Sequence, residues 1–79
     1  MNEAYIATFY SHFGAMAFHK KCKEAGFKSR IMPVPRALSS SCGTCVWFTG
    51  DCKLASDWGM EELEQMVKCV EKGGYEKIL

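Results

Sequence analysis

The sequence predicts a small α+β domain in which one antiparallel sheet carries two helices on a single face. Two observations predict this class. Strand-type and helix-type patterns alternate along the 79 residues, and both helical patterns are apolar on one side only. Covering one sheet layer with both helices is the economical way to bury two amphipathic helices in so short a chain. We expect the order β-α-β-β-α-β, a ferredoxin-like arrangement, within one domain over residues 1–79.

The first half of the chain predicts a strand, a helix and a second strand. Tyr5–Tyr10 is rich in β-branched and aromatic residues, which favours a strand. Ser11 can then cap a helix over residues 12–25, whose apolar residues recur at helical spacing. Gly26 stands where that helix should end, and a short strand should follow over residues 27–32.

The second half predicts the same alternation. Thr44–Thr49 is the strongest strand pattern in the sequence. A second helix is expected over residues 57–72, ended by Gly73 and Gly74, and a closing strand over residues 75–79. The apolar face of this helix would consist of Met60, Leu63, Met66, Val67 and Val70.

Trp47 and Phe48 are neighbours on the third strand, so their side chains should point to opposite faces of the sheet. One of them should lie in the core under the helices. The other should lie on the open face, where it could contact a partner, a second copy of the chain or a small ligand.

Composition excludes several classes of function. Ten basic and nine acidic residues give a net charge of +1, so no bulk field recruits nucleic acid or anionic lipid. The sequence has no secretory leader pattern and no apolar segment long enough to span a membrane. Five scattered cysteines do not resemble a disulfide framework, which predicts a cytoplasmic protein with reduced thiols.

The segment from Pro33 to Gly43 has the strongest functional pattern. Pro33 and Pro35 restrict the backbone and predict a stiff connection. Cys42 follows this connection, and Gly43 lets the backbone beside the sulfur approach another molecule. The pattern therefore predicts a presented thiol.

Residues near this thiol predict its chemistry. Arg36 can place a permanent positive charge near the sulfur, and Ser40 and Ser41 can donate hydrogen bonds to it. Such surroundings favour the thiolate, which is the nucleophilic form of cysteine. The plainer interpretation is that Arg36 pairs with a carboxylate, the serines are turn residues and Cys42 only begins a strand. The residues alone leave both open.

The other cysteines predict less. Cys45 completes a C-x-x-C spacing, but in a strand the two Cα atoms would be roughly 10 Å apart, beyond the reach of a disulfide. Cys45 is a second thiol for redox chemistry only if residues 42–45 form a turn. A zinc site at Cys42, Cys45 and Cys52 lacks a fourth ligand, so no metal is expected. Cys22 and Cys69 fit the core.

Several motifs resemble one known family. Phe9–Ser11, Ala15, Pro33–Arg36 and Ser41–Gly43 are similar to the putative selenium/sulfur carrier protein-like family, over roughly Tyr5 to Tyr75. Domains of this family are associated with selenium and sulfur metabolism, beside cysteine desulfurases. The resemblance implies a carrier role for Cys42, with Arg36 and Gly43 as its matched neighbours. The chain departs from the family pattern at Cys45, and it lacks the Cys-Pro-x-Pro motif of other sulfur carriers.

Two functions are consistent with these patterns. In the first, Cys42 holds sulfur or selenium as a persulfide, receives it from a desulfurase-type donor and passes it to an acceptor protein. The protein would then be a substrate of other enzymes more than an enzyme with its own turnover, and it would need no cofactor. In the second, the chain is a non-catalytic interaction or ligand-sensing module that forms a homodimer through the open sheet face.

Overall fold

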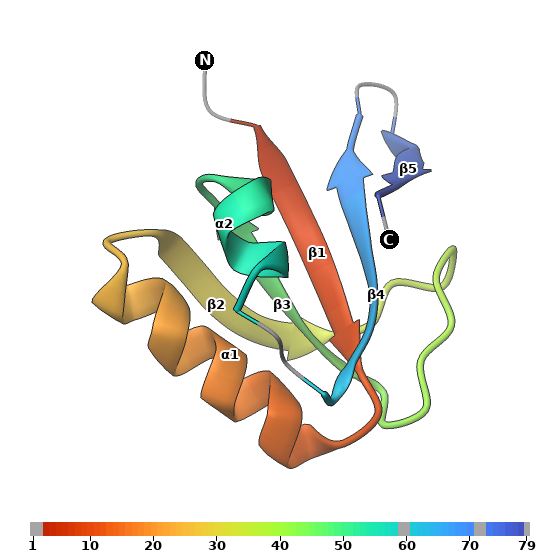
Figure 1. Ribbon diagram of the computed structural model, residues 1–79. Coiled ribbons are helices and arrows are strands. Elements are labelled where there is room, and N and C mark those ends of the chain that lie inside the picture. The colour runs from red at the N-terminus through yellow and green to blue at the C-terminus, as the bar shows by residue number, and fades with distance from the viewer. Residues whose placement is uncertain (1–2, 59–60, 71–72, 79) are drawn as a thin grey trace.

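The computed structural model describes residues 3–58, 61–70 and 73–78, and these form an α+β structure with a five-stranded antiparallel sheet and two helices (Figure 1). The strands lie in the order β2-β3-β1-β4-β5. The elements in chain order are β1 (Ala4–Phe9), α1 (His12–Glu24), β2 (Lys28–Pro33), β3 (Thr44–Thr49), α2 (Cys52–Ser56), β4 (Leu63–Cys69) and β5 (Tyr75–Lys77).

Both helices pack against the same face of the sheet, although the second is not the helix that the sequence predicts (Figure 1). Alternate residues of β1, β3 and β4 point to this face and form the main core with the inner side of α1. Phe18 of α1 lies at its centre, with its ring 5.2 Å from that of Phe9 and 5.3 Å from that of Phe48. The core residues are Tyr5, Ala7, Phe9, Ala15, Phe18, Cys22, Val46, Phe48, Ala55 and Met66.

The other face of the sheet is not bare. Ile6, Cys45 and Val67 are buried there in a second apolar cluster. Side chains of the loop after β2 and of the strands β2, β3, β4 and β5 cover this cluster. The covering residues are Met32, Val34, Leu38, Trp47, Cys69 and Tyr75. Trp47 and Phe48 therefore point to opposite faces as predicted, with Phe48 under the helices.

Local signals define α1 as the sequence predicts. Ser11 has an extended backbone with φ −137°, and its Oγ accepts a hydrogen bond from the Gly14 amide at 3.1 Å. Gly26 follows the helix with φ +81°, a conformation that favours glycine. With 13 and 5 residues, the helices of the described chain are too short to cross a membrane.

The predicted helix over residues 57–72 is wrong. Leu63–Cys69 is instead strand β4, which pairs with β1 on one side and β5 on the other. Met66 is buried in the main core, whereas its neighbour Val67 is buried on the opposite face. Because both faces of the strand bury apolar residues, the alternation typical of a half-exposed strand is absent and the pattern imitates a helix.

The second helix begins earlier than expected. Asp51 caps α2, its Oδ1 accepting hydrogen bonds from the amides of Lys53 at 2.9 Å and Leu54 at 3.3 Å. The order of elements is therefore β-α-β-β-α-β-β, with β5 as an added edge strand. Met60 of the predicted apolar face and Leu79 of the predicted last strand lie outside the described residues.

We predict that Gly14→Ala destabilises the protein although alanine favours helices over glycine by about 1 kcal/mol. A Cβ at position 14 would overlap Cβ of Glu62, in the segment that leads into β4. We expect the free energy of unfolding to fall by about 1–3 kcal/mol, measured by urea denaturation. Lys20→Ala on the exposed side of α1 is the control and should change little. A more stable Gly14→Ala protein would contradict this packing.

Candidate functional site

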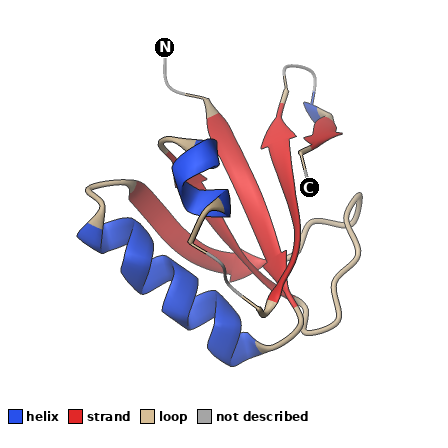
Figure 2. Cartoon of the chain, in the orientation of Figure 1, coloured by secondary structure: helices blue, strands red, loops and turns tan. Residues whose placement is uncertain are grey.

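The predicted site lies in the long loop between β2 and β3, drawn in tan in Figure 2. The Val34 amide donates to the Gly43 carbonyl at 3.2 Å and closes the loop at its base. Within the loop, the Leu38 amide donates to the Pro35 carbonyl at 3.0 Å. This bond closes a turn over residues 35–38 with Arg36 in its central pair, and Pro35 restricts the backbone at the first position of the turn.

Hydrogen bonds to neighbouring strands fasten the end of this loop. Ser40 Oγ donates to the Phe9 carbonyl at the end of β1 at 3.3 Å. Gln65 Nε2 of β4 donates to the Ser39 carbonyl at 3.1 Å. Ser39 and Ser40, which precede Cys42 in the loop, are thus attached to β4 and β1.

Glu64 makes the most extensive of these contacts. Its carboxylate accepts hydrogen bonds from Ser41 Oγ at 3.0 Å, from the Ser41 amide at 3.3 Å and from Thr8 Oγ1 at 3.3 Å. Thr8 is fully buried, and this carboxylate satisfies its hydroxyl. Glu64 therefore links the loop to β1 through charge-assisted hydrogen bonds.

A β-bulge explains why Glu64 reaches the loop. The register between β1 and β4 shifts between Thr8 and Phe9: Thr8 pairs with Gln65, and Phe9 pairs with Leu63. Glu64 is the extra residue on β4 and has no partner in this register. A bulge of this kind re-aims a side chain, here towards Thr8 and Ser41.

Cys42 is half-buried against the main core, and its sulfur faces backbone carbonyls. Sγ donates to the Phe9 carbonyl at 3.2 Å and to the Thr44 carbonyl at 3.4 Å. Ser40 Oγ lies 4.0 Å from the sulfur. Because a carbonyl oxygen only accepts hydrogen bonds, these contacts suit the protonated thiol.

Arg36 and Gly43 occupy different parts of the loop. Arg36 is exposed, and no hydrogen bond or ion pair joins it to Cys42 or to a carboxylate among residues 3–58, 61–70 and 73–78. The guanidinium is thus not held by another group of the described chain, and its support of the sulfur anion stays a prediction. Gly43 has φ +74° beside Cys42, and a side chain there would be strained by the backbone alone.

Burial keeps three of the other thiols protonated. It raises the pKa of Cys22 to about 12 and that of Cys45 to about 11, and it also raises the pKa of Cys69. Cys45 Sγ donates to the Pro33 carbonyl at 3.6 Å in the cluster on the far face of the sheet, whereas Cys42 packs against the main core. The two thiols of the C-x-x-C spacing are therefore directed to opposite faces.

Cys52 is a further half-exposed thiol, at the start of α2. The Tyr5 hydroxyl donates to the Glu3 carboxylate at 3.0 Å. The neighbouring Cys52 thiol, burial and this bond together raise the pKa of the Tyr5 hydroxyl. An ion pair between Lys68 and Glu3, 2.8 Å long, completes this group. In the part of the chain that is described, no three His, Cys, Asp or Glu side chains are grouped to hold a metal ion.

Sequence reasoning missed Glu64 and Gln65, because residues 57–72 were expected to form a helix, and it therefore also missed the contact between Glu64 and Thr8. It also missed His12, whose Nδ1 lies 3.0 Å from Thr44 Oγ1. This contact brings the first turn of α1 beside the residue whose carbonyl holds Cys42. The capping Ser11 was the signal in the sequence that a helix begins at this end of β1.

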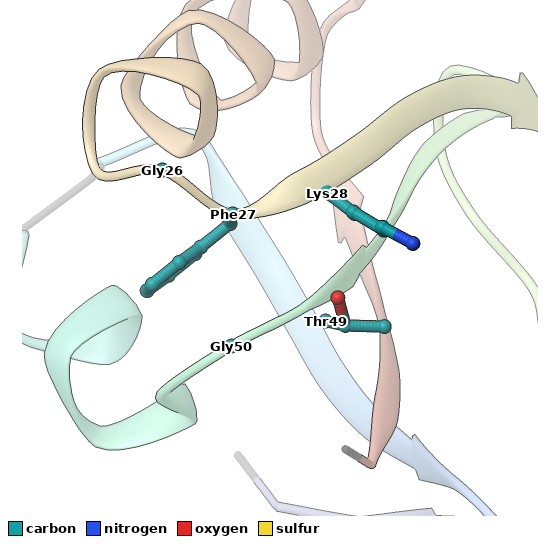
Figure 3. A pocket seen from close by; sticks show the side chains of 5 residues that line it. All are labelled: Gly26, Phe27, Lys28, Thr49 and Gly50. Carbon is teal, nitrogen blue, oxygen red and sulfur yellow. The ribbon is translucent and has the colours of Figure 1, made fainter.

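A pocket of about 280 Å³ lies at the other end of β3 (Figure 3). It is lined by Gly26, Phe27, Lys28, Thr49 and Gly50. None of the predicted site residues lines it. The Cys42 loop is therefore a surface site, separate from this pocket.

Comparison with known proteins identifies one family. A family model described as "Putative Se/S carrier protein-like" matches residues 4–77. The chain is also 28% identical over 69 residues to the uncharacterized protein YtiA of Escherichia coli (strain K12), covering 87% of this chain and 81% of YtiA. No solved structure matches the chain.

We predict that native Cys45 and Cys22 resist alkylation. A pKa of about 11 leaves about one Cys45 in a thousand as thiolate near pH 8, and raised pKa values mean less thiolate at any pH below them. Iodoacetamide should therefore modify Cys45 at least about 100-fold more slowly than a free cysteine peptide. Mass spectrometry of proteolytic fragments measures the rate at each cysteine. Fast labelling of Cys45 in the folded protein would contradict its burial, whereas fast labelling is expected after denaturation.

We predict that Glu64→Ala loosens the Cys42 loop. The substitution removes the acceptor of Ser41 and leaves the buried Thr8 hydroxyl without its partner. Loss of charged hydrogen bonds should increase local opening, so trypsin should cleave after Arg36 about tenfold faster. Glu76→Ala on β5 is the matched control, and urea denaturation separates local from global unfolding. An unchanged rate of cleavage in Glu64→Ala would show that the carboxylate does not hold the loop.

Proposed function

The chain belongs to the Putative Se/S carrier protein-like family, and from this premise we propose that it carries a sulfur or selenium atom on Cys42. One observation supports Cys42 in particular: it is a half-exposed thiol on a surface loop that two neighbouring strands, β1 and β4, hold in place. A carrier must present its sulfur to two partners in turn, which requires an accessible position of defined geometry.

The proposed loading reaction exchanges one S–S bond for another. Cys42 loses its proton to solvent, and the thiolate attacks the outer sulfur of a persulfide, R–S–SH, on a donor enzyme. A new S–S bond forms on Cys42, the donor S–S bond breaks, and the donor thiolate R–S⁻ leaves with the electron pair and takes up a proton. The reaction needs no external oxidant or reductant. Selenium would be transferred in the same way.

Loading requires the sulfur to leave its resting contacts. The carbonyls of Phe9 and Thr44 accept hydrogen bonds from the thiol, but they would repel a thiolate or a persulfide anion. Rotation of the Cys42 side chain away from them would direct the sulfur to solvent. We propose that Arg36, exposed in the same loop, then stabilises the anion.

The proposed partners are a cysteine desulfurase-like donor and an acceptor protein, so the chain acts as a substrate of other enzymes. We place it in the cytoplasm, where thiols remain reduced. We also regard its first six elements as a ferredoxin-like unit to which β5 is added. A dimerising module is supported less well, because the loop side chains and Tyr75 cover much of the sheet face that such a dimer would use.

We predict that incubation with a bacterial cysteine desulfurase and L-cysteine adds one sulfur atom, roughly 32 Da, to the protein. Cys42→Ser should abolish the adduct because it removes the attacking sulfur. Cys45→Ser and Cys52→Ser are the matched controls and should retain it. Mass spectrometry of the intact protein and of the Cys42 peptide measures the loading. Equal loading of Cys42→Ser and the wild type would exclude Cys42 as the carrying residue.

A further inference from the structure

Three apolar side chains stand exposed next to the Cys42 site. Phe13 is 78% exposed, Tyr10 55% and Met16 53%. Phe13 and Met16 are three residues apart on α1 and so share one side of the helix, and Tyr10 precedes the helix cap. We call these three residues the apolar patch.

The fold does not require this patch. The buried residues of α1 are Gly14, Ala15, Phe18 and Cys22, on the opposite side of the helix. Three of the large apolar side chains exposed on the described chain therefore gather on one short segment, where they contribute nothing to the core. Clustered exposed apolar residues mark an interaction site.

The patch adjoins the carrier thiol through a chain of contacts. Cys42 Sγ donates to the carbonyl of Phe9, which directly precedes Tyr10. It also donates to the Thr44 carbonyl, and Thr44 Oγ1 lies 3.0 Å from His12, which directly precedes Phe13. The first turn of α1 and the loop after β2 lie at the same end of the sheet (Figure 1). A protein that reaches Cys42 from this end would meet the patch.

Charge near the patch indicates what kind of partner protein would bind there. From Tyr10 to Lys23 the chain contains no acidic residue, and the exposed side of α1 carries Lys20, Lys21 and Lys23 after Met16. The acidic side chain of Glu62 accepts a hydrogen bond from the capping Ser11 at 2.9 Å and is engaged there. Glu24, the last residue of α1, is the one acidic residue of the helix, against three lysines. The surface is apolar beside Cys42 and basic further along α1, which complements an apolar partner surface with an acidic rim.

From these observations we infer that the apolar patch is the docking surface for the persulfide-bearing donor enzyme, whose contact surface is apolar at its centre and acidic beside it. Phe13 is the anchor, because it is the most exposed aromatic side chain of the patch and directly follows His12, which contacts Thr44. Lys20 and Lys23 orient the donor. This inference rests on the proposed carrier function.

The test compares two sources of sulfur. One is a purified bacterial cysteine desulfurase supplied with radiolabelled L-cysteine, and the other is glutathione persulfide, which needs no docking surface. We expect Phe13→Ala to lower the rate of loading from the desulfurase about tenfold or more, with unchanged loading from glutathione persulfide. Leu54→Ala, an exposed apolar residue of α2, is the matched control and should load normally from both.

Charge reversal gives a second measurement. Lys20→Glu combined with Lys23→Glu should slow loading from the desulfurase about threefold or more at low salt, and added salt should reduce the difference. Folding of each variant is checked by urea denaturation. Normal loading of Phe13→Ala by the desulfurase would overturn the inference while leaving the carrier function intact.

Other outcomes would show that the patch binds a second copy of the chain or the acceptor protein instead of the donor. A wild-type dimer that Phe13→Ala converts to monomers would assign the patch to a second copy of the chain and overturn the inference. Slower release of sulfur to an acceptor, with loading unchanged, would assign it to the acceptor and overturn it as well. Failure of the wild type to load from either source would instead refute the carrier function itself.

Discussion

The attachment of one loop to the ends of two strands determines where the thiol of this protein stands. Ser40, Ser41 and Cys42 each make hydrogen bonds with β1 or with Glu64 of β4. Loops are usually the most mobile part of a domain, and a sulfur on a free loop would have no defined position. Here the hydrogen bonds of Ser40, Ser41 and Cys42 give Cys42 a defined position at the surface.

The same contacts shield the sulfur of Cys42. Cys42 donates to two carbonyls and packs against the core, so the resting sulfur is a thiol with satisfied hydrogen bonds. Thiolates react readily with oxidants, whereas protonated, half-buried thiols are far less reactive. In the proposed carrier function, Cys42 would react only after its sulfur turns away from these carbonyls.

The comparison of prediction and structure depends on how local each signal is. Ser11, Gly26 and Thr44–Thr49 were predicted correctly, because a helix cap, a helix stop and a strand run each depend on a few neighbouring residues. β4 was predicted as a helix, because Met66 and Val67 are buried on opposite faces of a sheet with apolar cover on both. A local sequence pattern does not predict whether one face of a strand or both will be covered by other parts of the chain.

The sequence alone determined the α+β class, the first helix and the third strand, since these follow from residue type and spacing. Only the tertiary structure decided which groups surround the sulfur. Glu64 lies 22 positions after Cys42 in the sequence and reaches Ser41 because a bulge in β4 turns its side chain towards the loop. The carbonyls of Phe9 and Thr44 are backbone groups that any residue carries, so no side-chain pattern could have predicted that they would hold the thiol.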